Sequence, residues 1–319
     1  IAALALAVGL VLAVGGTAMA GKPAKPPKPD PEPEVANFAL VFVRDSNLMR
    51  MTSDGAAVET LLRTRDISSA SWVPDGTGIV FTRDTNAAGD EVWGKIYAVD
   101  SEGNNEVELL DFGDGGEQGA RYWVPGGQRL IGTRLTGEWL MTMDLVVGDL
   151  ETGSVHPLGL DPIFNSTLQG GAASPDLDAS TPGWQGWLVF AARHLDHDPG
   201  VNDTDYDLWS IWVEEIVAAN GSYSFAIDES TLTQLWLDGE QTQAQFSPDG
   251  TMLTFTTSDT PSGAGTFIAP FDSTTGTIGT PELLHAGTSS GSWSPDGAWW
   301  ASSKDFDILI IRPDGTGLG

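Results

Sequence analysis

The amino-acid sequence predicts an all-β chain that folds as a six-bladed β-propeller of four-stranded antiparallel blades, incomplete at the chain ends. A turn motif of the type Trp-Ser-Pro-Asp-Gly returns along most of the chain, and its prolines lie 51, 50, 73 and 47 residues apart. Each copy precedes two short apolar runs with the length and residue types of strands. The 39 glycines and 19 prolines supply turns, and a hydrophobic fraction of 40% suffices for a packed core.

The chain begins with an uncharged apolar stretch, residues 1–20, which ends in Ala18-Met19-Ala20. A small-x-small ending is the pattern that signal peptidase recognises, so we interpret this stretch as a partial signal peptide. The alternative is a membrane anchor, because about 20 apolar residues span a bilayer. The immediate change to a polar linker favours export, and we expect a periplasmic or secreted protein with no membrane insertion after cleavage.

Residues 21–37, GKPAKPPKPDPEPEVAN, form a Pro-rich linker. Such a segment adopts an extended polyproline conformation with a rise of about 3.1 Å per residue, so it would hold the propeller away from the start of the chain. The alternative is a Pro-rich ligand for another protein domain. The sequence has no cysteine, which excludes disulfides, thiol catalysis, thiolate metal sites and a lipid-attachment site.

The charge balance is strongly acidic, with 15 Lys and Arg against 44 Asp and Glu and a net charge of −29. A polyanion would be repelled by such a surface, so nucleic acid is excluded as a partner. The ordinary interpretation of the excess is a solvated acidic surface that keeps the protein soluble.

The repeat begins at residue 38 and continues to residue 319. Five units contain the turn motif, whereas the first unit, ALVFVRD with NLMRMTSDG, starts without it, so blade one is expected to lack its innermost strand. The last unit stops at RPDGTGLG, where an outer strand should still follow. A seventh blade hidden in the 73-residue interval is the alternative. The expected blades are 38–65, 66–112, 118–160, 168–238, 242–287 and 290–319.

The motif has a physical explanation as a turn. Pro presets φ at the second turn position, the Asp side chain bonds its own backbone, and Gly accepts a positive φ. The preceding aromatic residue is suited to packing between neighbouring blades. The residues of this structural motif are Trp72, Pro74, Asp75, Gly76, Trp123, Pro125, Pro175, Asp176, Phe246, Pro248, Asp249, Gly250, Trp293, Pro295, Asp296 and Gly297.

These motif copies, with the following I-x-F and I-Y-x-x-D-x-x-G runs, resemble the PD40 repeats of the TolB-like β-propeller family, which are similar to WD40 repeats. The resemblance covers residues 38–319 and implies the fold. It implies little about function, because the family includes the propeller of the Tol-Pal system, propellers of prolyl oligopeptidase-like peptidases and oligogalacturonate lyases. The chain departs from TolB itself, since a linker stands where TolB has an α/β domain, and from the peptidases, since no hydrolase domain is visible.

The densest polar cluster is 194–207, an insertion between the two central strands of blade four. Hard oxygen ligands of this kind suit Ca²⁺, whose charge would relieve the repulsion among the carboxylates. An EF-hand is excluded, because Leu208 stands where the loop needs Gly and Glu214 lies in a predicted strand. A non-EF calcium loop and a solvated acidic hairpin remain the two interpretations. The candidate ligands are Asp196, Asp198, Asn202, Asp203, Asp205 and Asp207, and no other cofactor is expected.

Other candidate features favour structural explanations. The stretch 287–291 matches G-x-S-x-G but precedes a strand rather than a helix, so it is interpreted as a loop. The histidines are expected at the surface, and the tryptophans either line a glycan or peptide groove or pack blade against blade. These residues are His156, His194, His197 and His285, and Trp184, Trp187, Trp209, Trp212, Trp236, Trp299 and Trp300.

No residue set supports a reaction, so no catalytic residue is assigned. The sequence favours an exported, non-catalytic propeller that binds a protein or peptide partner in the cell envelope. The alternatives are a lyase-like, glycan-processing enzyme and an accessory propeller of a hydrolase. An enzyme of the first kind predicts histidines and carboxylates that converge on the central channel.

Overall fold

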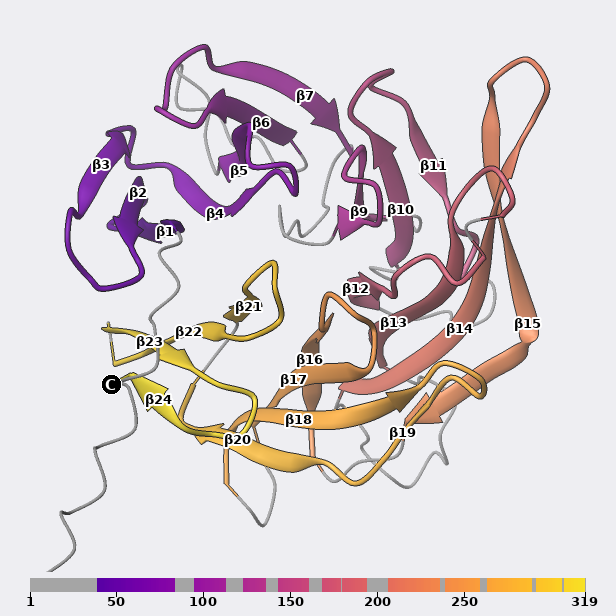
Figure 1. Cartoon of the computed structure of the whole chain (residues 1–319). Coiled ribbons are helices and arrows are strands. Elements are labelled where there is room, and N and C mark those ends of the chain that lie inside the picture. The colour runs from indigo at the N-terminus through magenta and orange to yellow at the C-terminus, as the bar shows by residue number, and fades with distance from the viewer. Residues whose placement is uncertain are drawn as a thin grey trace, which may run out of the picture. The chain divides into compact units, whose positions relative to one another are not determined.

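Six antiparallel β-sheets lie around a ring in the computed structural model (Figure 1). Short apolar runs separated by turn-forming residues produce these strands, and the structure contains no helix among the residues that it describes. It describes residues 39–83, 95–112, 123–135, 143–160, 168–178, 180–193, 206–235, 239–258, 263–288, 291–305 and 307–318. The all-β six-bladed propeller expected from the repeat is confirmed.

The first three sheets follow one another along the chain. The first sheet contains β1 (Ala39–Arg44), β2 (Asn47–Thr52) and β3 (Glu59–Leu62). The second contains β4 (Ile67–Trp72), β5 (Gly78–Arg83), β6 (Lys95–Asp100) and β7 (Val107–Asp111). The third contains β8 (Trp123–Val124), β9 (Arg129–Leu135), β10 (Met143–Asp149) and β11 (Val155–Pro157).

The remaining three sheets complete the ring. The fourth contains β12 (Leu168–Ala173), β13 (Gln185–Arg193), β14 (Tyr206–Val217) and β15 (Tyr223–Leu235). The fifth contains β16 (Gln241–Phe246), β17 (Met252–Thr257), β18 (Gly265–Asp272), β19 (Thr277–Ile278) and β20 (Glu282–Ala286), the last two of which both pair with β18. The sixth contains β21 (Gly291–Trp293), β22 (Trp300–Lys304), β23 (Asp307–Ile311) and β24 (Gly317–Leu318).

The core lies between sheets rather than within them. Five clusters of buried apolar side chains join sheets one and two, two and three, three and four, four and five, and five and six. A central strand such as β10 therefore buries side chains on both faces and is buried along its whole length. Strands β1, β3 and β7 are more exposed. Among the described residues, no comparable cluster joins the sixth sheet to the first.

Within the ranges that the structure describes, the first sheet has no counterpart of the innermost strand that the other five sheets possess. In sheets two to six the first strand lies nearest the centre of the ring, as β12, β16 and β21 show (Figure 1). The first sheet begins instead with β1, which has the register of a second strand. Strand β1 pairs with β2, from Ala39 opposite Thr52, in the same way as β5 pairs with β6, from Gly78 opposite Asp100. The expectation of a missing inner strand in blade one is confirmed.

One other expectation about the ring was wrong, and the alternative of a seventh blade is not supported. The last sheet does have an outer strand, because β24 pairs with β23 through Ile310 and Leu318. The 73-residue interval holds no further blade, because the long strands β13, β14 and β15 of a single sheet fill its described part.

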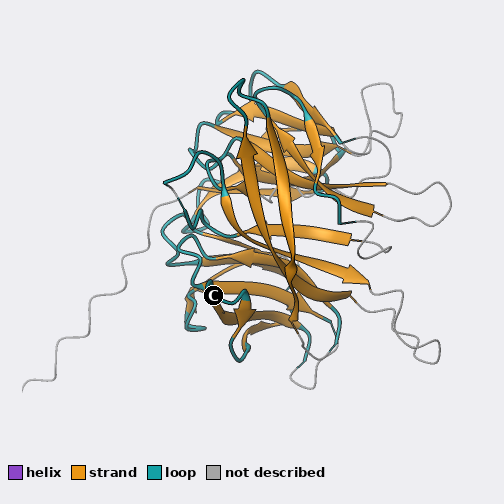
Figure 2. Ribbon diagram, turned by 90° about the vertical axis from the view of Figure 1, so that its right-hand side faces the viewer, coloured by secondary structure: helices purple, strands orange, loops and turns teal. Residues whose placement is uncertain are grey.

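Strand order places the turns on two faces of the ring. Antiparallel pairing brings the motif turns, such as 73–77, and the turns after third strands, such as 101–106, to one face, which we call the motif face. Figure 2 shows most of the described turns gathered there, on its left-hand side. The β1–β2 hairpin turn, Asp45–Ser46, and the β3–β4 link, 63–66, lie at the other face, which we call the hairpin face. In the described residues, no helical segment has the length and hydropathy needed to cross a membrane.

Candidate functional site

The carboxylates of the repeated motif are engaged within their own turns. Asp249 accepts hydrogen bonds from Ser247 Oγ (2.6 Å) and Thr251 N (3.1 Å). Asp296 accepts from Ser294 Oγ and Ala298 N in the same way. The seryl hydroxyl is the main reason why the pKa of each carboxyl lies below its usual value. These aspartates stabilise turns on the motif face.

The carboxylates of Asp75 and Asp176 also accept hydrogen bonds from nearby groups, but the donors differ. Asp75 accepts from Thr77 N and Thr77 Oγ1 at 2.9 and 2.6 Å, and the threonyl hydroxyl lowers its pKa. Asp176 accepts from Asp178 N and Gln185 N at 3.1 and 3.2 Å. Every carboxylate of the motif therefore has a local structural partner.

The motif also joins neighbouring blades: its aromatic residue was expected to do so, whereas the contact between its glycine and a proline was not predicted. The glycine of one turn lies against the proline of the preceding turn. A Cβ added at Gly250 would lie 2.7 Å from Cδ of Pro175, and one added at Gly127 would lie 3.3 Å from Cγ of Pro74. The aromatic residues make further links, because Trp72 Nε1 donates to Ala39 O (3.2 Å) and Trp123 Nε1 donates to Ser71 Oγ (3.1 Å). The remaining motif residues are Pro125, Phe246, Pro248, Trp293, Pro295 and Gly297, of which Phe246 packs edge-on against Phe271 and Trp293 against Trp300.

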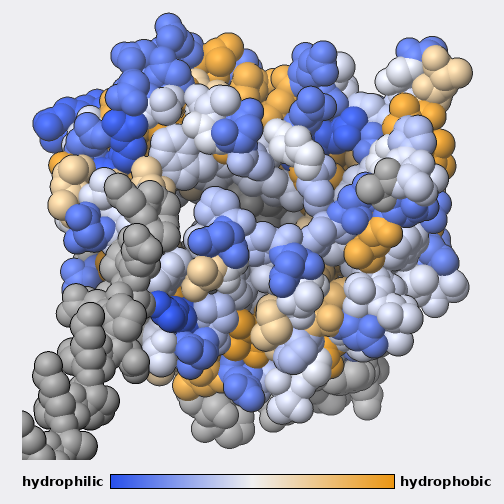
Figure 3. Space-filling model, in the orientation of Figure 1, coloured by the Kyte–Doolittle hydropathy of each residue, from blue (hydrophilic) through white to orange (hydrophobic). Residues whose placement is uncertain are grey.

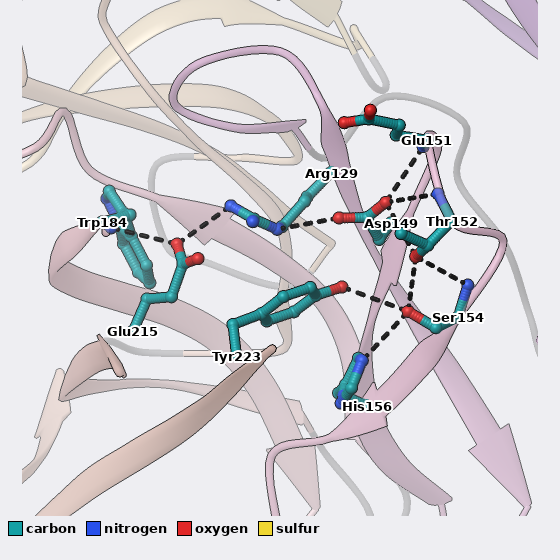
Figure 4. Close-up of polar contacts among 9 residues, drawn as sticks. All are labelled: Arg129, Asp149, Glu151, Thr152, Ser154, His156, Trp184, Glu215 and Tyr223. Atoms are coloured by element: carbon teal, nitrogen blue, oxygen red, sulfur yellow. Dashed lines mark hydrogen bonds and ion pairs between the residues drawn. The ribbon is translucent and has the colours of Figure 1, made fainter. Parts of the chain in front are cut away.

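A buried polar network crosses from the third sheet to the fourth on the motif face (Figure 4). Arg129, at the start of β9, places Nη1 2.9 Å from Glu215 Oε2 in β14 and Nε 3.4 Å from Asp149 Oδ2 at the end of β10. The second contact is an ion pair without hydrogen-bond alignment. The Glu215 side chain is 1% exposed and also accepts from Trp184 N at 3.1 Å. The guanidinium lies 4.3 Å from the ring centre of Tyr223.

Asp149 is ionised despite its burial. Burial opposes the charge, but hydrogen bonds from Thr152 and the charge of Arg129 outweigh it and lower the pKa of Asp149. Burial raises the pKa of the Tyr223 phenol, which keeps the hydroxyl neutral. Two carboxylates thus hold one guanidinium between two blades.

The network includes a serine and a histidine within hydrogen-bond distance. Ser154 Oγ lies 3.0 Å from His156 Nε2, 2.7 Å from Thr152 Oγ1 and 3.5 Å from Tyr223 OH. The imidazole also packs on Tyr223, with ring centres 4.4 Å apart. A Ser-His-acid arrangement needs a carboxylate on the other ring nitrogen, and in the described part of the chain none bonds to His156. Among the described residues, the pair is one contact within a partly buried network.

Most of the expected calcium ligands lie outside the described residues, namely Asp196, Asp198, Asn202, Asp203 and Asp205, together with His194 and His197. Asp207 is the second residue of strand β14 and accepts from Gln234 Nε2 at 2.8 Å. Glu214 lies in the same strand, in agreement with the argument against an EF-hand. Over the described ranges, no group of three or more histidines and carboxylates is arranged to hold a metal ion.

The tryptophans divide between the core and the partly exposed surface. Trp184, Trp187, Trp299 and Trp300 are buried, with Trp187 Nε1 donating to Ser273 O in the next sheet at 2.8 Å. Trp209 and Trp212 are partly buried, and Trp236 lies outside the described residues. Trp184, Trp187 and Trp300 belong to clusters that join neighbouring sheets, whereas Trp299 lies under the guanidinium of Arg312, which follows β23 of the same sheet.

Among the described residues, no strand pairs with the inner side of β1, so in this part of the chain β1 is an open edge toward the centre of the ring, and we call this the vacant inner position of the first sheet. Leu40, Val41, Phe42 and Val43 are each partly exposed, whereas their register equivalents in β5, Ile79 to Thr82, are all buried. The difference follows from the missing strand, which in the second sheet is β4. Figure 3 shows an opening near the middle of the ring, on the side of the first sheet. An edge strand with unsatisfied backbone groups is a template for another strand.

A basic hollow lies at the hairpin-face end of the first sheet. It has a volume of about 370 Å³ and is lined by Arg44, Asp45, Asn47, Met49, Thr60, Arg63 and Arg65. Three of the chain's 15 Lys and Arg residues therefore surround one hollow, against a single aspartate. Sequence reasoning missed this site, although the repeated FVRD and FTRD runs, which align Arg44 with Arg83, were a usable signal.

The backbone that builds the hollow is strained. Asp45, Ser46 and Arg65 have φ values of 51°, 55° and 61°, which non-glycine residues rarely adopt. Asn47 Nδ2 donates to Asp45 O (3.0 Å) and to Arg44 O (3.4 Å), which holds the hairpin turn in this conformation. Strained backbone of this kind concentrates at functional sites.

Comparison with solved structures shows the fold. The chain is similar to TolB from Acinetobacter baumannii, with 20% identity and a TM-score of 0.53 over 87% of this chain and 61% of that one. It is also similar to a protein assigned as TolB from Agrobacterium tumefaciens, with 14% identity and a TM-score of 0.51 over 82% and 83% of the two chains. An oligogalacturonate lyase from Vibrio parahaemolyticus gives 13% identity and a TM-score of 0.50 over 88% and 73%.

These likenesses establish a TolB-like six-bladed propeller fold, as the repeats predicted. The chain spans 61% of the Acinetobacter TolB with which it aligns. No family model matches the sequence, and no curated protein matches it. Because TolB and a lyase share the fold, the fold alone does not distinguish a binding protein from an enzyme.

Proposed function

We propose that this chain is an exported, non-catalytic propeller of the cell envelope that binds a partner protein by accepting an extended segment at the open edge of β1. The observation that carries the proposal is the vacant inner position of the first sheet. Export rests on the signal-like residues 1–20.

The main chain of β1 supplies the affinity in this mode of binding. A strand added to a sheet edge forms backbone hydrogen bonds along its length, while side chains on alternate residues provide specificity. Six residues of β1 pair with β2 on one side, and no described strand pairs with the other side, where another strand could add; the carbonyl of Ala39, at the start of β1, already accepts from Trp72 Nε1. The geometry is that of β4 against β5 in the next sheet, where Trp72 pairs with Ile79 and Ala70 with Phe81.

Burial of apolar side chains adds to the backbone bonds. Leu40, Val41, Phe42 and Val43 would pass from partial exposure toward the burial that their equivalents have in β5. Each square ångström of apolar surface removed from water contributes about 25 cal/mol. An alternating apolar segment suits this surface, because its inward-facing side chains meet the first and second sheets.

The test uses a fluorescent peptide with the sequence of residues 66–73, DISSASWV, which forms the equivalent strand of the second sheet. We expect saturable binding to the full chain, measured by fluorescence anisotropy. The matched control replaces the two serines at positions 68 and 71 of the peptide by proline, which removes backbone donors. The control peptide should bind at least about tenfold more weakly. Equal binding of the two peptides, or no binding of either, would refute strand addition at β1.

A further inference from the structure

We infer that the edge of β1 selects a partner segment with Ser or Thr opposite Val41 and an apolar residue opposite Leu40, because the indole N–H of Trp72 takes that hydroxyl as its acceptor. The inference rests on the proposed function, because it names the chemistry of the segment that β1 accepts. The other blades of the same chain supply the internal precedent.

In four of the other blades, a backbone amide of the motif joins the end of the innermost strand to the second strand. In the second sheet, Trp72 pairs with Ile79, and the next amide, Val73 N, donates to Gly78 O at 2.9 Å. The same contact recurs in the fourth, fifth and sixth sheets. The bonds are Ser174 N to Trp187 O (2.8 Å), Ser247 N to Met252 O (2.9 Å) and Ser294 N to Trp299 O (2.8 Å).

In the first sheet, an indole of the next blade occupies the place of this amide. Ala39 is the register counterpart of Gly78, because it begins the pairing of β1 with β2 as Gly78 begins that of β5 with β6. No described strand supplies an amide to Ala39 O, which accepts instead from Trp72 Nε1 at 3.2 Å. Trp72 ends β4, which lies beside β1 (Figure 1). The indole thus covers one end of the edge at which a strand would add.

The second and third sheets show where this indole lies when an innermost strand is present. Trp123 is the motif tryptophan of the third sheet and pairs with Leu130 as Trp72 pairs with Ile79. Its Nε1 donates at 3.1 Å to Ser71 Oγ, in the innermost strand of the preceding sheet. A complete blade therefore offers a side-chain hydroxyl to the indole of the next blade, and its own amide takes the backbone carbonyl.

A segment that adds to β1 in the register of β4 should reproduce this exchange. Its residue opposite Leu40 corresponds to Trp72 of β4, and the following amide would donate to Ala39 O in place of the indole. Its residue opposite Val41 corresponds to Ser71, from which a hydroxyl would receive Trp72 Nε1. Indole is a donor only, and an N–H that is covered without an acceptor costs free energy. Ser or Thr is therefore preferred over Ala at this position of the segment.

A hydroxyl suits this position better than a carboxylate, although both accept hydrogen bonds. The precedent, Ser71, is small and partly buried. A carboxylate would have to leave water and approach a protein with a net charge of −29, which opposes its binding. The expected partner is a protein with an extended stretch in which Ser or Thr directly precedes an apolar residue, followed by any residue except Pro, which has no amide N–H.

The experiment combines three peptides with three forms of the full chain. The peptides are DISSASWV, DISSATWV and DISSAAWV, which carry Ser, Thr and Ala at the position of Ser71. The proteins are the wild type, W72F, and the control W123F, which removes the equivalent indole donor of the next blade. Affinity is measured by fluorescence anisotropy, and a melting curve verifies the folding of each variant. The comparison of peptides on the wild type is independent of any variant.

We expect the wild type and W123F to bind the Ser and Thr peptides about fivefold more tightly than the Ala peptide. W72F should lose this preference and bind the three peptides within twofold of one another. A second measurement uses ¹⁵N-labelled protein and unlabelled DISSASWV. The indole N–H signal of Trp72, identified by its absence from the spectrum of W72F, should shift on binding, whereas that of Trp123 should stay in place.

If the Ser and Ala peptides bind the wild type within twofold of each other, the edge does not select a hydroxyl, although strand addition at β1 stands. A preference retained in W72F, or a Trp72 indole signal that bound DISSASWV does not move, overturns the assignment to Trp72. If no peptide binds, because another segment of this chain covers the edge or because no strand docks there, both this inference and the proposed function are wrong.

Discussion

At the scale of single residues, the motif glycines meet two separate requirements, a positive φ within the turn and space for a neighbouring proline, and the sequence does not distinguish between them. Gly76 and Gly250 occupy the same turn position with φ of 73° and 72°. Nothing lies within 4 Å of a Cβ built at Gly76, whereas one at Gly250 would lie 2.7 Å from Pro175. The first glycine serves its turn alone, and the second also serves the contact between the fourth and fifth sheets.

Substituting each of these glycines by alanine therefore gives unequal losses. Gly76→Ala should cost about 1 kcal/mol, the cost of a left-handed alanine. Gly250→Ala should cost an additional 1–3 kcal/mol, roughly, because the methyl group overpacks against the proline ring. Urea denaturation of the two variants compares them directly. Equal losses would show that the turns do not pack between blades.

Arg129 is the residue on which the interblade network depends. Arg129→Met leaves the carboxylate of Glu215, 1% exposed, without its cation. Breaking a buried pair from one side costs about 3 kcal/mol, so the variant should unfold at clearly lower urea concentration. The exposed Arg63→Met is the control and should change the free energy of unfolding by less than about 0.5 kcal/mol. The double variant R129M/E215Q should recover part of the loss, and failure to do so would argue against pairing as the cause.

Asp149 gives the network a dependence on pH. Its folded-state pKa is lowered from 3.8, so its contribution to stability is present above about pH 4 and is lost as the pH falls through the folded-state value. Asp149→Asn should lower the melting temperature at pH 7, with a loss of about 1.5 kcal/mol. The difference from the wild type should shrink as the pH falls below about 4, toward the lowered folded-state pKa of Asp149. A difference that stays constant over this range would mean that the carboxylate charge contributes nothing.

At the scale of strands and turns, the sequence predicted the features that depend on the conformational preferences of neighbouring residues. The motif turns follow from the conformational preferences of Pro, Asp and Gly. The missing inner strand followed from the absence of a motif copy before ALVFVRD, and the structure shows β1 at that edge. The short outer strand β24 was missed, because a two-residue run has no periodicity to detect.

Contacts between strands far apart in sequence were not accessible in this way. Arg129 and Glu215 are 86 residues apart, and nothing in either local sequence indicates that the motif turn of one blade faces the third strand of the next. The basic hollow was missed for a related reason, since Arg63 and Arg65 lie in a link with no repeat pattern of its own. Only the alignment of one repeat on another connects Arg44 with Arg83.

At the scale of the whole molecule, the two faces of the ring differ in the contacts that they carry. The motif face carries satisfied Asp turns, proline–glycine contacts and the Arg129 network, all of which join blades. The first sheet departs from this regular pattern, because its inner position is vacant and its hairpin-face end holds the basic hollow. The first sheet is therefore the candidate for a specific function, and the repeated blades form the scaffold around it.

Hydrogen exchange of the β1 backbone amides, measured by mass spectrometry on the full chain, tests this account most directly. In the free protein, residues 39–44 should exchange at least about tenfold faster than their equivalents 78–83, which have strands on both sides. Addition of the peptide DISSASWV should slow exchange of the backbone amides in residues 39–44 and leave exchange in residues 78–83 unchanged. Exchange in 39–44 that is already as slow as in 78–83, or that the peptide does not alter, would contradict an open edge that receives a partner strand.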